Sequence, residues 1–189
     1  MTALPGDHGI AAPVAAAAGA GLWMGMMLSA VPGAAPWAIG GAVFGLLAWV
    51  TVEDARSFTI PDLALAPLAG IAGAAAWDAG VPLWQMALGI VAPAAALWLV
   101  RETFYRRRGV DALGFGDVKL AGVLGLLLGM EGFALALLAA SLAGLAFAGA
   151  LRLAGRDVTA ETKLPLGAFL APAAFALWCL TGGGTAALW

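Results

Sequence analysis

Charged residues are scarce in this chain: they make up 11% of its 189 residues, whereas 63% are hydrophobic. The mean hydropathy of +0.97 is far above what a water-soluble domain of this length needs. The apolar residues form stretches of about 17 to 22 residues, each long enough to cross ~30 Å of hydrocarbon as a helix. The composition therefore predicts a helical membrane protein, and we expect no nucleic-acid partner.

Cysteine and histidine are almost absent, since each occurs once. Cys179 lies in an apolar segment with no second cysteine for an intramolecular disulfide, and His8 is isolated near the amino terminus. These absences exclude a cysteine-rich or histidine-based zinc module and a Ser-His or Cys-His catalytic dyad. We therefore expect neither a metal nor another cofactor.

The apolar stretches predict an all-α polytopic bundle of about seven transmembrane helices, forming a single domain over residues 1–189. The predicted spans are Ile10–Val31, Trp37–Val52, Ile60–Trp77, Val81–Val100, Asp117–Met130, Phe133–Leu153 and Leu164–Leu180. The first residues lack the basic region of a secretory signal peptide, so we expect the first span to be retained.

The nine basic residues all fall on alternate connections between spans or at their edges, and the other connections have none. They are Arg56, Arg101, Arg106, Arg107, Arg108, Lys119, Arg152, Arg156 and Lys163. Lys and Arg near the ends of spans are retained in the cytoplasm. The pattern therefore predicts a cytosolic amino terminus and an external carboxyl terminus.

Most of the eleven acids are expected to be solvated loop or rim residues, and the five of functional interest are Glu53, Asp54, Asp62, Asp111 and Asp117. Asp54 lies where the second span leaves the hydrocarbon, a depth at which ionisable groups are enriched for function, although a pair with Arg56 would also explain it. Asp62 has a better structural explanation. Thr59 as N-cap, Pro61 in the first turn and Asp62 three residues after Thr59 resemble a capping box.

Asp117 ends the sequence Gly114-Phe115-Gly116-Asp117 and opens the fifth span. The residues that continue its helical face are small, namely Ala121, Gly125 and Gly129. Small residues let another helix approach closely, so we expect Asp117 to face a helix rather than lipid. The two preceding glycines would let backbone or an extended peptide approach the acid. A glycine-rich turn with an acid near a helix N-terminus is the ordinary structural alternative.

Two carboxylates at the same membrane depth suit peptide hydrolysis because they can share one proton. The ionised carboxylate takes a proton from water, while the protonated one donates to the carbonyl oxygen of the peptide bond. We therefore predict that Asp54 and Asp117 form a catalytic pair. Lys119 is the one competitor as a base, and it could instead snorkel to the membrane interface.

These motifs together resemble the type IV prepilin peptidases, membrane aspartyl proteases with a GxGD motif. The resemblance lies in Asp54 with Ile60-Pro61-Asp62, in Gly114 to Leu120, and in Leu164 to Leu170, where Leu166 and Ala168 depart from the family pattern. It covers residues 51–172. It implies that Asp54 and Asp117 are catalytic, and that the supporting motif residues are Gly114, Gly116, Lys119, Pro61, Asp62, Pro165 and Gly167.

The resemblance implies a multi-pass enzyme of the bacterial inner membrane whose active site faces the cytosol. The implied reaction is removal of the leader peptide from pilin-like precursors, just before their hydrophobic helix. The expected partners are thus this precursor and the lipid bilayer. Glu53 and Asp111 are candidates for contacting a basic leader.

Longer members of this family carry an amino-terminal insertion with paired cysteines and also methylate the new pilin amino terminus. This chain has no paired cysteines. It resembles the compact form found with tight-adherence pili, so we do not expect methyltransferase activity.

Two other interpretations stay open. One is another GxGD protease, such as a preflagellin peptidase, although Ile60-Pro61-Asp62 and Leu164–Leu170 favour a prepilin peptidase. The other is a small cation- or proton-coupled transporter in which the two acids bind the ion. Apart from Gln85 and Ser141, the centres of the spans consist of Ala, Gly, Leu and Val. These side chains would give a transported ion few ligands.

Overall fold

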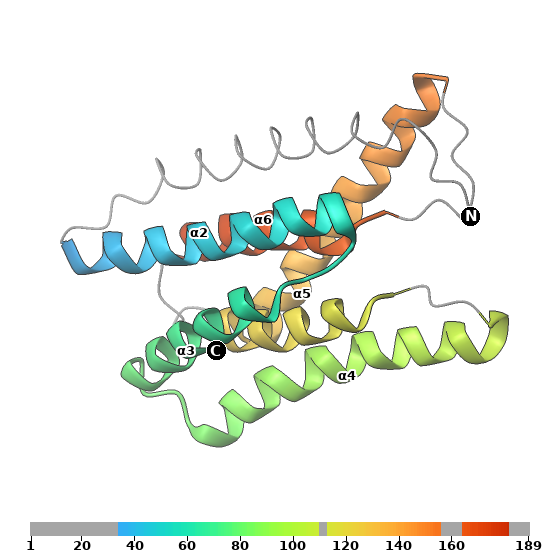
Figure 1. The fold of residues 1–189 in the computed structure, drawn as a ribbon. Helices are drawn as coiled ribbons and strands as arrows, with labels where there is room; N and C mark the ends of the chain where they lie inside the picture. The colour runs from blue at the N-terminus through green and yellow to red at the C-terminus, as the bar shows by residue number, and fades with distance from the viewer. Residues whose placement is uncertain (1–33, 110–112, 156–163, 182–189) are drawn as a thin grey trace.

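The computed structural model describes residues 34–109, 113–155 and 164–181, and every regular element in these ranges is an α-helix (Figure 1). The helices are α2 (Ala34–Ser57), α3 (Asp62–Asp78), α4 (Leu83–Arg108), α5 (Phe115–Leu153) and α6 (Leu166–Leu180). The predicted all-α class is confirmed over this part of the chain. The first predicted span, Ile10–Val31, lies outside the described residues, so the full set of about seven helices stays a prediction.

Within the described ranges, three helical segments are long and apolar enough to cross a membrane: Ala38–Ser57, Leu83–Arg107 and Phe115–Leu153. Large apolar side chains also cover much of the outer surface; Leu63 is 78% exposed and Leu145 is 71% exposed. Contiguous apolar surface of this kind is unfavourable in water and favourable in lipid. The fold is therefore that of a membrane protein.

Successive helices run in alternating directions, so that the ends of several helices meet at one end of the bundle. Helix α6 lies beside α2, and α5 packs against α3, α4 and α6 (Figure 1). The end of α2 and the starts of α3, α5 and α6 all lie toward the same end (Figure 1). Residues from four helices can therefore meet there.

Helix α5 contains two of the predicted spans and bends between them. Gly129 has φ 71° and ψ 175°, a conformation that is essentially restricted to glycine. The chain changes direction at this point (Figure 1), so two helical segments are confirmed. The predicted connection at Glu131–Gly132 is wrong, because these residues are already helical and Gly129 alone makes the turn.

The small face of α5 allows a close contact with α4. A Cβ atom on Gly125 would overlap the carbonyl oxygen of Gly89 and would lie 2.6 Å from Cγ of Pro93. Gly122 has a similar role, since its Cβ would lie 3.3 Å from the carbonyl oxygen of Ile90. The predicted helix approach is thus confirmed at Gly125, while Gly129 serves the bend instead.

We expect Gly125→Ala to destabilise the protein. Alanine favours a helix by up to about 1 kcal/mol over glycine, but overpacking a tight contact costs about 1–3 kcal/mol, so the balance is unfavourable. The measurement is the midpoint of thermal unfolding in detergent. Gly149→Ala on the same helix is the control, because a Cβ there would have no atom from the rest of the described chain within 4 Å. Equal midpoints for Gly125→Ala and the wild type would contradict this packing.

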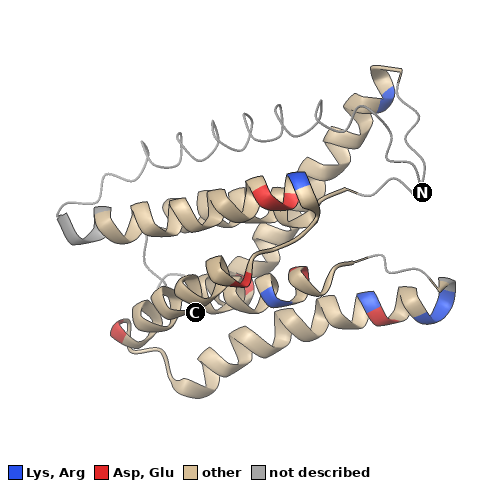
Figure 2. Cartoon of the chain, viewed as in Figure 1, with Lys and Arg blue, Asp and Glu red and all other residues tan. Residues whose placement is uncertain are grey.

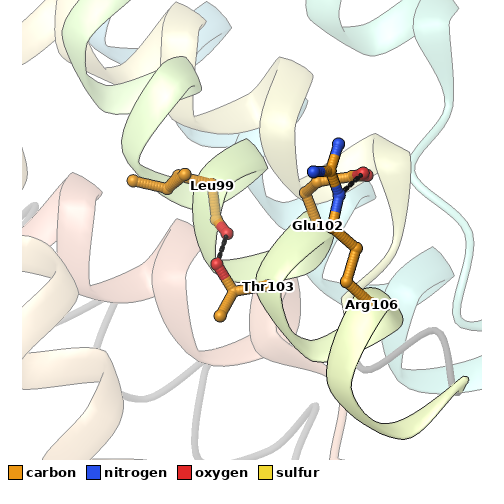
Figure 3. A network of polar contacts seen from close by, with 4 residues as sticks. All are labelled: Leu99, Glu102, Thr103 and Arg106. Atoms are coloured by element: carbon orange, nitrogen blue, oxygen red, sulfur yellow. Dashed lines mark hydrogen bonds and ion pairs between the residues drawn. The ribbon is translucent and has the colours of Figure 1, made fainter.

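Helix α4 extends beyond its predicted end at Val100 and carries polar residues out of the apolar stretch. Thr103 Oγ1 donates to the carbonyl oxygen of Leu99 at 2.6 Å, and Arg106 Nε donates to Glu102 Oε1 at 2.6 Å (Figure 3). Arg101 Nε donates to the carbonyl oxygen of Leu113 at 3.1 Å. This last bond ties α4 to the residue that directly precedes Gly114.

Candidate active site

Asp54 is buried in the last turn of α2, where its side chain is 4% exposed. Its Oδ2 accepts a hydrogen bond of 2.8 Å from the backbone N–H of Ala168 in the first turn of α6. The N-cap of α6 is Pro165, and α6 has no side-chain cap from its own sequence. Asp54 therefore satisfies a free N–H of another helix, as an N-cap residue would. The described residues show no ion pair between Asp54 and Arg56.

Asp117 lies in the first turn of α5 and is 8% exposed. Its Oδ2 accepts a hydrogen bond of 3.2 Å from the backbone N–H of Gly114, the N-cap residue of α5. Its Oδ1 is buried and accepts no hydrogen bond from any residue in the described ranges. As predicted, Asp117 faces the helices of the bundle, and one of its oxygens has no donor among the described residues.

The structure brings Asp54 and Asp117 into one site at the start of α6. The two carboxylates lie close enough to repel each other electrostatically. A buried pair of like charges is costly unless a proton or nearby donors compensate it. The arrangement is therefore suited to holding one shared proton between two acids.

Two of the motif glycines, Gly116 and Gly167, allow close packing around this pair. A Cβ on Gly167 would lie 2.9 Å from Asp54 Oδ2 and 3.1 Å from Ile60 Cδ1, and a Cβ on Gly116 would lie 3.0 Å from Ile60 Cβ. Ile60 is 7% exposed and fills the space beside both glycines. We expected the glycines to let backbone or an extended peptide come close, and at Gly116 it is the chain's own backbone at Ile60 that does so. Ile60 is the site residue that sequence reasoning missed, and its only signal was its place in the Ile60-Pro61-Asp62 motif.

Asp62 and Lys119 form an ion pair that links the starts of α3 and α5. Lys119 Nζ donates to both carboxylate oxygens of Asp62, at 2.8 and 2.9 Å. The same ammonium lies 5.6 Å from the ring centroid of Phe115. Lys119 thus has a specific partner, which its interpretation as a snorkelling residue did not foresee.

The predicted capping box at the start of α3 is wrong. Pro61 is the N-cap, α3 begins at Asp62, and Thr59 Oγ1 donates to the carbonyl oxygen of Ser57 at 3.2 Å. Asp62 is indeed in the first turn, but Thr59 lies too early in the chain to cap the helix. The reason is that residues 59–61 are not helical and Pro61 is extended, while Ile60 packs against Gly116.

The other candidate residues have separate positions. Glu53 is half-buried, and its Oε1 accepts a hydrogen bond of 3.0 Å from Ser57 Oγ in the same helix. Pro165 is buried at the start of α6. Asp111 lies outside the described residues, so its role as a leader contact stays a prediction.

The fold and the site define a helical membrane protein with a buried pair of carboxylates near one end of its bundle. Residues 41–149, more than half of the chain, match the model of the type IV leader peptidase family. The matched region includes both Asp54 and Asp117. The chain therefore belongs to the type IV leader peptidase family.

Several curated relatives are named prepilin leader peptidase/N-methyltransferase. The chain is 39% identical to that of Dickeya chrysanthemi over 104 residues, which are 54% of this chain and 36% of the relative. It is 33% identical to that of Burkholderia pseudomallei over 142 residues, 74% of this chain and 45% of the relative. It is 31% identical to that of Pectobacterium carotovorum over 161 residues, which are 81% of this chain and 51% of the relative. The chain thus spans about half or less of the length of these relatives. No solved structure matches it significantly.

Proposed function

We propose that this protein is a membrane aspartyl endopeptidase of the bacterial inner membrane that removes the leader peptide of prepilin-like precursors. The observation that carries the proposal is the burial of Asp54 and Asp117 side by side at the start of α6, in a chain of the type IV leader peptidase family. The names of the relatives support a prepilin substrate. The proposal covers peptide cleavage only and leaves out methyl transfer.

In the proposed reaction the two carboxylates hold one proton between them. The ionised carboxylate accepts a proton from water as the water oxygen attacks the scissile carbonyl, and the protonated carboxyl group donates to the carbonyl oxygen. Breakdown of the tetrahedral intermediate then transfers a proton to the leaving amine. The Oδ1 atom of Asp117, which accepts no hydrogen bond from the described residues, is available for the shared proton.

The proposed orientation places this site at the cytosolic face. The described Lys and Arg residues lie toward the end of the bundle that holds the carboxylate pair (Figure 2), and basic residues mark the cytosolic side. The test uses cysteines introduced by Asp78→Cys and Arg107→Cys in a Cys179→Ser background. A membrane-impermeant thiol reagent applied to intact spheroplasts should label the cysteine at position 78 and not the one at position 107. Labelling at position 107 alone would refute the orientation.

The Asp62–Lys119 pair should have a modest effect on cleavage. The Asp62 side chain is 71% exposed and that of Lys119 is 42% exposed, and exposed ion pairs contribute only about 0–1 kcal/mol. We expect Asp62→Asn to lower kcat/KM by less than about 10-fold. Asp62→Asn/Lys119→Gln should be no slower than the slower single variant, because both remove one interaction. Complete loss of cleavage in well-folded Asp62→Asn would show that Asp62 takes part in the chemistry.

The direct test of the proposed function is cleavage by the purified wild-type protein. A full-length pilin precursor is incubated with it in detergent or liposomes, and mass spectrometry identifies the new amino terminus. The proposal predicts one cut between the basic leader and the hydrophobic helix. A precursor that stays intact in the presence of well-folded enzyme would contradict the proposed function. Preflagellin-like substrates would then be tested, followed by ion transport.

A further inference from the structure

Phe58 has an unusual backbone conformation at the carboxyl end of α2. Its φ is 53°, and it is the one non-glycine residue with positive φ in the described part of the chain. Its N–H donates to the carbonyl oxygen of Asp54 at 2.9 Å. This bond defines the left-handed C-terminal motif of a helix, in which glycine is usual because it has no Cβ to clash. Helix termination alone therefore does not explain a phenylalanine here.

Packing in the core does not explain it either. The side chain of Phe58 is 54% exposed, so burial of its ring does not compensate for the strained backbone. Strained residues of this kind cluster at functional sites. Phe58 lies four residues after Asp54 and two before Ile60, which contacts both Gly116 and Gly167. The strained residue thus belongs to the segment that lies against the carboxylate pair.

We propose that Phe58 is a substrate-binding residue whose ring contacts an apolar side chain of the precursor just after the scissile bond. This inference rests on the proposed function and deepens it. The hydrogen bond from its N–H to the backbone carbonyl oxygen of Asp54 fixes the backbone of Phe58 at the end of the helix that carries Asp54. A precursor side chain that packs on Phe58 would therefore bind one helical turn along the chain from this carboxylate.

The local charges favour an apolar contact over a basic one. Arg56 is exposed two residues before Phe58. Its positive charge would repel the basic residues of a leader peptide. It would not oppose an apolar side chain from the hydrophobic helix that follows the leader.

The test compares variants that keep or remove the ring. Phe58→Gly and Phe58→Asn tolerate positive φ and lack the ring, whereas Phe58→Tyr keeps it. For the first two we expect an unchanged or higher unfolding midpoint, a KM raised by about tenfold and a kcat within about twofold of wild type. Phe58→Tyr should resemble the wild type. Trp98→Leu removes another exposed aromatic residue, 45% exposed, and controls for anchoring in the membrane interface.

A double-mutant cycle shows whether the contact is direct. A precursor in which serine replaces the first apolar residues after the cut should have a higher KM with the wild-type enzyme and little further change with Phe58→Gly. Additive effects, an unchanged KM for Phe58→Gly, or a lower kcat at constant KM would each overturn the inference. These outcomes leave the proposed function intact if the wild type cleaves the unchanged precursor. If it does not, both proposals fail.

Discussion

Asn in place of either Asp54 or Asp117 is expected to lower kcat for leader cleavage by about 10³-fold or more, the scale of general acid–base catalysis. Each change removes a titrating group at nearly constant volume. The amide oxygen of Asn at position 54 can still accept the N–H of Ala168, which Asp54 binds at 2.8 Å. We therefore expect membrane insertion and the unfolding midpoint to change little while activity is lost.

The effects of the two substitutions on the cleavage rate should also be non-additive. If the carboxylates work as one unit, the Asp54→Asn/Asp117→Asn double variant should be about as slow as either single variant. Asp78→Asn is the matched control, since Asp78 is an exposed acid at the other end of α3. Kinetics are measured with purified enzyme and precursor. Turnover within about tenfold of wild type in either single variant would contradict the two-carboxylate mechanism.

Gly167→Ala is the second change with a large expected effect, because it inserts a methyl group beside the catalytic pair. The added Cβ would lie 2.9 Å from Oδ2 and 3.2 Å from Cγ of Asp54. Relief of this contact has to move the carboxylate or the start of α6. A displacement of about 1 Å can cost roughly 100-fold in rate, and we expect kcat to fall by about that factor.

Gly45→Ala separates this effect from a general effect of alanine in the bundle. Gly45 lies in α2, the helix of Asp54, and a Cβ there would have no atom of another described segment within 4 Å. The kcat of Gly45→Ala should equal that of the wild type. Both variants are measured for kcat and for the unfolding midpoint. Wild-type kcat in Gly167→Ala would show that the close contact between α6 and Asp54 is not needed for the reaction.

Apolar runs and acids at their ends predicted the main features of the fold and of the site. The described helices α2 to α6 follow the predicted spans, and Asp54 and Asp117 are both buried and close together. These features were predictable because hydrophobic length sets a membrane helix, and because a carboxylate at that depth needs a specific environment.

The features that the sequence did not predict depend on contacts between distant residues. The Asp62–Lys119 pair joins residues 57 positions apart, and the bond from Ala168 to Asp54 joins residues 114 apart. Thr59 was the predicted cap of α3, but Ile60 packs on Gly116 and the N-cap is Pro61. The bend in α5 had several glycines available, and only the three-dimensional path of the chain selects Gly129.

An assay in cells tests the claim that Asp54 and Asp117 together cut a prepilin leader. A pilin precursor is co-expressed with the wild type, with Asp54→Asn and with Asp117→Asn at matched membrane levels, and its processing is followed by electrophoresis and by sequencing of the product. We predict complete processing by the wild type and none by either variant. Processing by a variant, or an intact precursor beside well-expressed wild type, would contradict the claim.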